Sequence, residues 1–235
     1  MNTRLAILTG VLALFVSATA LSQNYKHFPG PAVDQKTMRA LERVEQLYER
    51  GDYARALFIY EKELAPVGDK YAQYMVGYMY LAGKSVPPNR PAALAWYRLA
   101  AERGEPAIVQ ARDALHNSMS PEEVEISNGL FADLWRRIGD NRLILDLISE
   151  DMQILRARTG TRIPGGTTGQ LMMINMSGNG GAERFYKDVR ERLQTRLEYL
   201  KTNVEIIDIE QDDEVTEVRS LEQEIRKELA ALGMP

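Results

Sequence analysis

Apolar side chains recur every three or four residues along most of the chain from Gln35 onward, which is the period of one face of an α-helix. A first helix is expected from Gln35 to Gly51. A second is expected from Tyr53 to about Pro66, with Asp52 placed to cap its start. Because the turn between the two helices is short, we expect them to lie antiparallel and side by side.

The same pattern appears again in a second pair of short helices. One is expected over Tyr71–Gly83 and the other over Pro91–Gly104, with a loop of Gly, Pro and Asn between them. Gly77 lies inside the first of these helices, where Gly is unfavourable by about 1 kcal/mol relative to Ala. We explain it by a close approach of the facing helix, on which Ala95 and Ala100 are also small.

Further helices are expected over Pro106–Leu115, Ser120–Arg137 and Asn141–Arg158. The second of these opens with Ser-Pro-Glu-Glu, the pattern of a capping box. Residues 159–181 are rich in Gly, Thr, Ser and Asn and predict a linker. The helical period resumes in residues 182–235 with narrow apolar stripes, which are typical of a helical hairpin or a coiled coil.

The first 22 residues have the pattern of a secretory signal peptide. Arg4 supplies a positive charge, Leu5–Val16 is apolar, and the small residues that follow suit cleavage. The alternative is an uncleaved membrane anchor, but the apolar run is shorter than the roughly 20 residues that a spanning helix needs. Residues 23–34 are expected to form a flexible lead-in.

Composition narrows the class of protein. The chain has no cysteine, so it has neither a disulfide nor a thiol nucleophile, and the hydrophobic fraction of 45% is typical of a globular protein. The formal net charge of -4 does not suit nucleic-acid binding, which needs a basic surface. We therefore expect a periplasmic or secreted bacterial protein that has no membrane span after signal cleavage.

The second helix pair resembles the Sel-one-like repeat, a short relative of the tetratricopeptide repeat. The preceding pair is similar to a tetratricopeptide unit. The chain departs from the repeat pattern at Ser85, Asn89 and Pro91, all in the loop or at the start of the second helix. The matching positions are Ala72, Tyr74, Gly77, Tyr80, Gly83, Val86, Ala92, Trp96, Tyr97, Ala100, Ala101 and Gly104.

The resemblance implies an all-α fold, a short α-solenoid of antiparallel helix pairs with a concave face that binds another protein or peptide. We expect a helical-repeat domain over residues 35–158, the Gly-rich linker over 159–181, and the C-terminal helical hairpin or coiled coil over 182–235. Tyr78 and Tyr97 are expected to be exposed and to contact the partner. Leu171, Met172 and Met173 are interpreted either as a partner-binding strip or as a segment packed against the domain.

The sequence contains few residues that could form a catalytic, metal-binding or cofactor-binding site. The histidines, His27 and His116, are too far apart for a metal set without cysteine. The Gly-rich segments lack the Lys-Ser or Lys-Thr of a phosphate-binding loop, and the acidic run around Asp212 lacks EF-hand spacing. We expect no cofactor, no metal site and no catalytic residues.

Three functions are compatible with this sequence. The first is a non-catalytic adaptor or scaffold of the cell envelope. The second is an envelope hydrolase that uses two carboxylates, for which Glu102, Glu105, Glu122 and Glu123 are available. The third is a structural protein that self-associates through its C-terminal helices. The repeat pattern favours the first.

Overall fold

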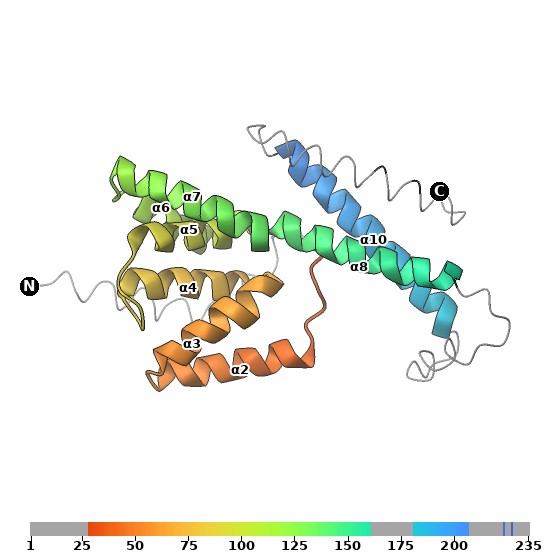
Figure 1. Cartoon of the computed structure of the whole chain (residues 1–235), viewed down its shortest axis with the longest axis horizontal. Helices are drawn as coiled ribbons and strands as arrows, with labels where there is room; N and C mark the ends of the chain where they lie inside the picture. Colours follow the sequence, from red (N-terminus) through yellow and green to blue (C-terminus); the bar gives the residue numbers. More distant parts are fainter. Residues whose placement is uncertain (1–27, 161–180, 207–222, 224–226, 228–235) are drawn as a thin grey trace, which may run out of the picture.

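The computed structural model describes residues 28–160 and 181–206 and the single positions 223 and 227, and all of its regular structure in this part is helical (Figure 1). The predicted all-α fold is therefore confirmed. No helix in the described part is both long and apolar enough to cross a membrane. The helices are α2 (Gln35–Glu49), α3 (Tyr53–Ile59), α4 (Lys70–Ala82), α5 (Arg90–Ala100), α6 (Pro106–His116), α7 (Pro121–Ile138), α8 (Asp140–Gly160) and α10 (Gly181–Ile206).

Polar caps and glycines set the helix ends, as the sequence predicts. Asp52 accepts a hydrogen bond from the backbone N–H of Arg55 at the start of α3. At the start of α7 both hydrogen bonds of the capping box are present, between Ser120 and Glu123. Gly83 closes α4 in the left-handed conformation that glycine adopts at least cost.

The helices stack on one another: α2 packs with α3, α4 packs with α5, and α6 and α7 each pack on α5 (Figure 1). Between α3 and α4 the chain continues through a π-helical turn, η1 (Tyr60–Leu64), and a 3-10 turn, η2 (Ala65–Val67). The buried side chains of Tyr60 and Leu64 in η1 join the first pair to the second. The expected docking of one antiparallel pair on the pair before it is confirmed.

Gly77 lies where α4 and α5 touch. A Cβ atom on this residue would lie 2.6 Å from the Tyr97 ring and 3.1 Å from the carbonyl oxygen of Ala93. The predicted close approach is confirmed, but the facing residues are Ala93 and Tyr97 rather than Ala95 and Ala100. The latter two are buried elsewhere in the core.

Helix α8 runs on from α7 almost in line, and α10 crosses back along it in the opposite direction (Figure 1). Gly139, with extended backbone, separates α7 from α8. The α8–α10 pair has a core of its own, built from Ile144, Leu147, Ile148, Met152 and Leu155 of α8 and Val189, Leu193 and Leu200 of α10. The apolar face of α8 thus packs against α10, not inside the helical-repeat stack with which the sequence grouped it.

Helix α8 extends to Gly160, two residues into the predicted linker, and α10 begins at Gly181. The residues between them lie outside the described part of the chain. The last predicted helix, beyond residue 206, also lies outside it apart from positions 223 and 227. The division into a repeat domain, a linker and a C-terminal region stays a prediction.

Candidate protein-binding groove

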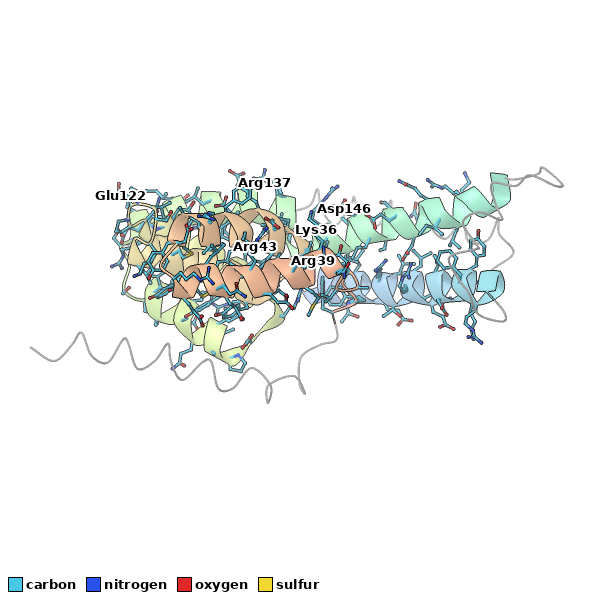
Figure 2. All side chains as sticks on the ribbon, turned by 90° about the horizontal axis from the view of Figure 1, so that it is seen from below. Lys36, Arg39, Arg43, Glu122, Arg137 and Asp146 are labelled. Atoms are coloured by element: carbon cyan, nitrogen blue, oxygen red, sulfur yellow. The ribbon has the colours of Figure 1, made fainter. Side chains whose placement is uncertain are left out.

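Helix α2 carries cations along one face. Lys36, Arg39 and Arg43 are spaced by three and four residues, so they follow one another on the helix surface. Figure 2, which views the molecule from below, shows all three on the near side of α2. Arg50 continues the row two turns further on.

A shallow groove runs between this face of α2 and the neighbouring α3 and η1. It consists of two adjoining hollows of about 630 and 450 Å³ that share Arg43, Phe58 and Glu63. Phe58 projects from α3 with 59% of its surface exposed, a large fraction for an aromatic residue of a helical stack. We call this surface the α2–α3 groove. Its residues are Gln35, Lys36, Arg39, Ala40, Arg43, Gln46, Leu47, Arg50, Arg55, Phe58, Ile59, Lys62 and Glu63.

The groove is strongly positive although the whole chain is acidic. Its lining holds six cations and one acid, Glu63. Three of the six cations form ion pairs: Arg43 with Glu63 at 2.9 Å, Arg55 with Asp52 at 2.8 Å and Lys62 with Glu61 at 2.5 Å. All three of these cationic side chains remain more than half exposed. Within the described residues, Arg39 and Arg50 make no ion pair. Positive charge is therefore available to a ligand.

One acidic residue of α2, Glu45, lies away from the groove. Glu45 is near Tyr71 of α4: burial, and then the charge of Glu45, raise the pKa of Tyr71 to about 12. The carboxylate of Glu45 therefore does not offset the cations of the groove.

A second hollow, of about 750 Å³, lies between residues 28–34, α2 and α10. Its arginines are already engaged. Arg103 donates two hydrogen bonds to Asp140, at 2.8 and 2.9 Å, and its guanidinium lies 3.6 Å from the ring centroid of Phe28. Arg196 is paired with buried Asp151. This hollow therefore joins parts of the fold and offers less free charge than the α2–α3 groove.

Beside it lies a buried ion cluster. The ammonium of Lys70 contacts Glu102 at 2.5 Å, Asp140 at 3.0 Å and the carbonyl oxygen of Leu99 at 3.0 Å. Burial raises the pKa of Glu102 against the opposing effect of Lys70. Burial alone would also raise the pKa of Asp140, but hydrogen bonds from Arg103 and the charge of Lys70 outweigh it and lower that pKa. Neither carboxylate lines the groove or the second hollow.

The predicted binding residues have mixed outcomes. Tyr97 is 3% exposed and stacks on Tyr74 with ring centroids 5.0 Å apart, so its expected exposure is wrong. The helical period showed that Tyr97 lies on a helix face but not that α4 covers this face. Tyr78 is partly buried and packs against the core, and its contact with a partner stays a prediction. Leu171, Met172 and Met173 lie outside the described residues.

Two of the four carboxylates of the hydrolase alternative, Glu102 and Glu123, have structural partners; Glu105 precedes α6 without a side-chain cap hydrogen bond. Glu102 belongs to the buried ion cluster, and Glu123 closes the capping box of α7 and pairs with Arg90 at 3.3 Å. Glu122 stands in the first turn of α7, where a negative charge is favourable. In the described residues no group of three or more metal-ligating side chains comes together.

The α2–α3 groove was not predicted from the sequence, because the apolar positions that predict the helices do not tell which polar face of α2 borders α3. The signal was present in the spacing of Lys36, Arg39 and Arg43. The exposure of Phe58 had no such signal, since an aromatic residue beside a helical stripe is more often buried.

Comparison with known proteins bears on the α4–α5 pair. The model of the Sel1 repeat family matches residues 70–105, which begin with α4 and end just after α5. These residues form a Sel1-like helical repeat, as the sequence indicated. Repeats of this family generally mediate protein–protein interaction. Neither the search of curated proteins nor that of solved structures found a match.

Proposed function

We propose that this protein is an exported, non-catalytic interaction module of the cell envelope that binds another protein through the α2–α3 groove. Its Sel1 repeat supports the general class, because such repeats typically act as protein-binding units without catalysis. The rest of the proposal depends on the chemistry of the groove and on the first residues of the chain.

One observation carries the choice of site: the first helix pair of the stack presents a positive groove with an exposed aromatic residue at its centre. In stacked repeats each pair covers the next, and a terminal pair needs a polar outer surface for solubility. The outer surface of α2 and α3 is polar at its rim but keeps Phe58 exposed. Arginine and aromatic residues together are the most common anchors of protein interfaces.

The binding proposal is tested by capture from an envelope extract with three forms of the protein. These are the wild type, the double variant R39Q/R43Q, and the control double variant R136Q/R137Q on α7, where the same change removes two exposed arginines. We expect a partner that the wild type and the control retain and the groove variant loses. Equal retention by all three forms would contradict the assignment of the groove.

The envelope location rests on the signal-like residues 1–22, which lie outside the described part of the chain. We expect the full chain, expressed in a bacterium, to appear in the periplasm or the medium with a new N-terminus after Ala20 or Ser22. Fractionation and N-terminal sequencing measure this. Retention of Met1 with the protein in the cytoplasm would contradict export.

A further inference from the structure

The α2–α3 groove has a chemically matched segment within the same sequence. Residues 207–218 follow directly after α10 and contain no Lys or Arg. Four apolar residues, Ile207, Ile209, Val215 and Val218, are interspersed among the acids. The acidic residues are Asp208, Glu210, Asp212, Asp213, Glu214 and Glu217. We call residues 207–218 the acidic segment; it lies outside the described residues.

We infer that the α2–α3 groove of one molecule binds the acidic segment of a second copy. The inference rests on the proposed function, since it names an occupant for the same groove. Six acids meet a groove with six cations, of which, in the described part of the chain, Arg43, Arg55 and Lys62 are already paired within the fold and Lys36, Arg39 and Arg50 are not. The exposed ring of Phe58 offers an apolar surface to the isoleucines and valines of the segment. Complementary charge of this kind selects a partner and speeds encounter, and it weakens as salt is added.

The arrangement of the helices favours binding of the acidic segment from a second copy over binding of the acidic segment from the same molecule. In Figure 1 the C-terminal end of α10 lies above α8, whereas α2 lies at the bottom of the stack. The cationic face of α2 is the face seen from below in Figure 2. The chain thus leaves α10 on the side of the molecule opposite the groove.

Such a contact joins two different surfaces, so it is heterologous. Each molecule would use its groove for one neighbour and its acidic segment for another, and the assembly would form a ring or an open chain. This geometry leads to a testable prediction. A variant with a disrupted groove and a variant with a neutralised acidic segment should still form one contact, between the intact acidic segment of the first and the intact groove of the second.

The direct test uses a labelled synthetic peptide of residues 207–218. The receptor is the chain from Gln23 onward, which keeps every described residue, with its own acidic segment neutralised by Asp→Asn and Glu→Gln changes. We expect saturable binding by fluorescence anisotropy that falls as NaCl rises from 50 to 500 mM. R39Q/R43Q removes two solvent-exposed charge pairs and should weaken binding about tenfold. The α7 control R136Q/R137Q should leave it unchanged.

The second test measures mass by light scattering. We expect the wild-type chain from Gln23 onward to associate at low salt, and the groove variant R39Q/R43Q and the segment-neutralised variant each to be monomeric. An equimolar mixture of the two variants should form a heterodimer. Circular dichroism checks that each variant keeps its helices, so that loss of folding is not read as loss of binding.

Two results would overturn the inference: a wild-type chain that stays monomeric while the peptide shows no saturable binding, or peptide binding that is equal for the groove variant and the α7 control. Neither would overturn the proposed function, because a partner captured from the envelope extract and lost in R39Q/R43Q would still place a different protein in the groove. If neither the peptide nor any partner from the envelope extract bound in a way that depended on Arg39 and Arg43, the groove would be excluded from both proposals.

Discussion

Ser85 holds a conformation that its side chain disfavours. It has a φ of 73°, and among the described residues it is the only non-glycine with positive φ. The chain departs from the Sel-one-like pattern at this point of the loop, and Asn89 just beyond it caps α5 by accepting a hydrogen bond from the backbone N–H of Ala92 at 3.0 Å. The loop therefore keeps the backbone shape of the repeat although two of its residues differ from the pattern.

Replacing Ser85 with Gly should stabilise the protein by up to about 1 kcal/mol, because the left-handed conformation no longer strains a Cβ atom. Urea unfolding followed by circular dichroism measures the change. Ser149→Gly is the matched control: Ser149 lies within α8, where the same replacement should destabilise by about 0.5–1 kcal/mol. A loss of stability in Ser85→Gly would show that this side chain is needed in the loop.

Glu102 and Asp140 share one ammonium, that of Lys70, but only Asp140 is also bound by Arg103. A proton added to the cluster therefore goes to Glu102 first, in agreement with the raised pKa of Glu102 and the lowered pKa of Asp140. The charged form of Glu102 is the less favourable one in the folded state, despite its ion pair.

This asymmetry predicts a pH dependence. Between the ordinary pKa of Glu102, 4.5, and its raised value in the fold, the folded chain binds more protons than the unfolded one. The free energy of unfolding contributed by Glu102 therefore falls as pH rises through this window. In urea unfolding between pH 4.5 and 7, wild type should lose stability relative to Glu102→Gln as pH rises. A difference that does not vary with pH would show that the pKa of Glu102 is not raised.

At the scale of the helices, the sequence predicted where each helix begins and ends better than it predicted which helices pack together. Asp52, Gly83 and Ser120 stop or start helices through local hydrogen bonds and backbone freedom, which a short stretch of sequence contains. The apolar face of α8 was also evident from its period. That face packs on α10, some forty residues further along the chain, and the periodicity of a helix does not tell which other helix covers it. The exposure of Tyr97 was misjudged for the same reason.

The contact between α4 and α5 depends on Gly77. Gly77→Ala should destabilise by about 1–2 kcal/mol, because a Cβ 2.6 Å from the Tyr97 ring overpacks the interface by more than the improved helix propensity returns. Gly129→Ala is the matched control within α7, where nothing lies within 4 Å, and should stabilise by up to about 1 kcal/mol. Thermal unfolding of both variants measures the contrast, and equal effects would disprove the close approach.

The α8–α10 pair is held by a buried carboxylate. Asp151 of α8 pairs with Arg196 and Arg192 of α10, and Arg196 is itself buried. Asp151→Ala leaves the Arg196 guanidinium without its counter-ion and should cost about 3 kcal/mol.

Hydrogen exchange should show faster exchange in α8 and α10 of Asp151→Ala, with α4 and α5 little affected. Asp146→Ala is the control, because Asp146 forms an exposed pair with Arg142 within α8 and should contribute less than about 0.5 kcal/mol. Uniform loss of protection over all helices would show that the two parts open together.

At the scale of the molecule, Phe28 of the N-terminal segment contacts both the repeat stack and the α8–α10 pair. Phe28 lies between Arg103, at the end of the repeat stack, and Tyr199 of α10, with the Phe28 and Tyr199 ring centroids 5.4 Å apart. Arg196 adds a hydrogen bond to the carbonyl oxygen of Pro29 at 3.1 Å. The sequence predicted residues 23–34 to be a flexible lead-in because they lack an apolar period; the contacts that fix residues 28–30 come from side chains distant in the sequence.

Phe28→Ala removes the cation–π contact with Arg103 and the edge contact with Tyr199, a loss of about 1–2 kcal/mol in total. It should also separate the unfolding of the two parts. Trp96 and Trp135 both belong to the repeat stack, so tryptophan fluorescence reports on that part alone, whereas circular dichroism reports on all helices. In wild type the two urea transitions should coincide.

In Phe28→Ala the circular dichroism transition should begin at lower urea, since the α8–α10 pair loses its support while the stack keeps its own core. Phe58→Ala, which removes an exposed ring, should leave the transitions coincident. Coincident transitions in Phe28→Ala would show that the junction between α7 and α8, with the ion cluster at Asp140, couples the two cores without Phe28.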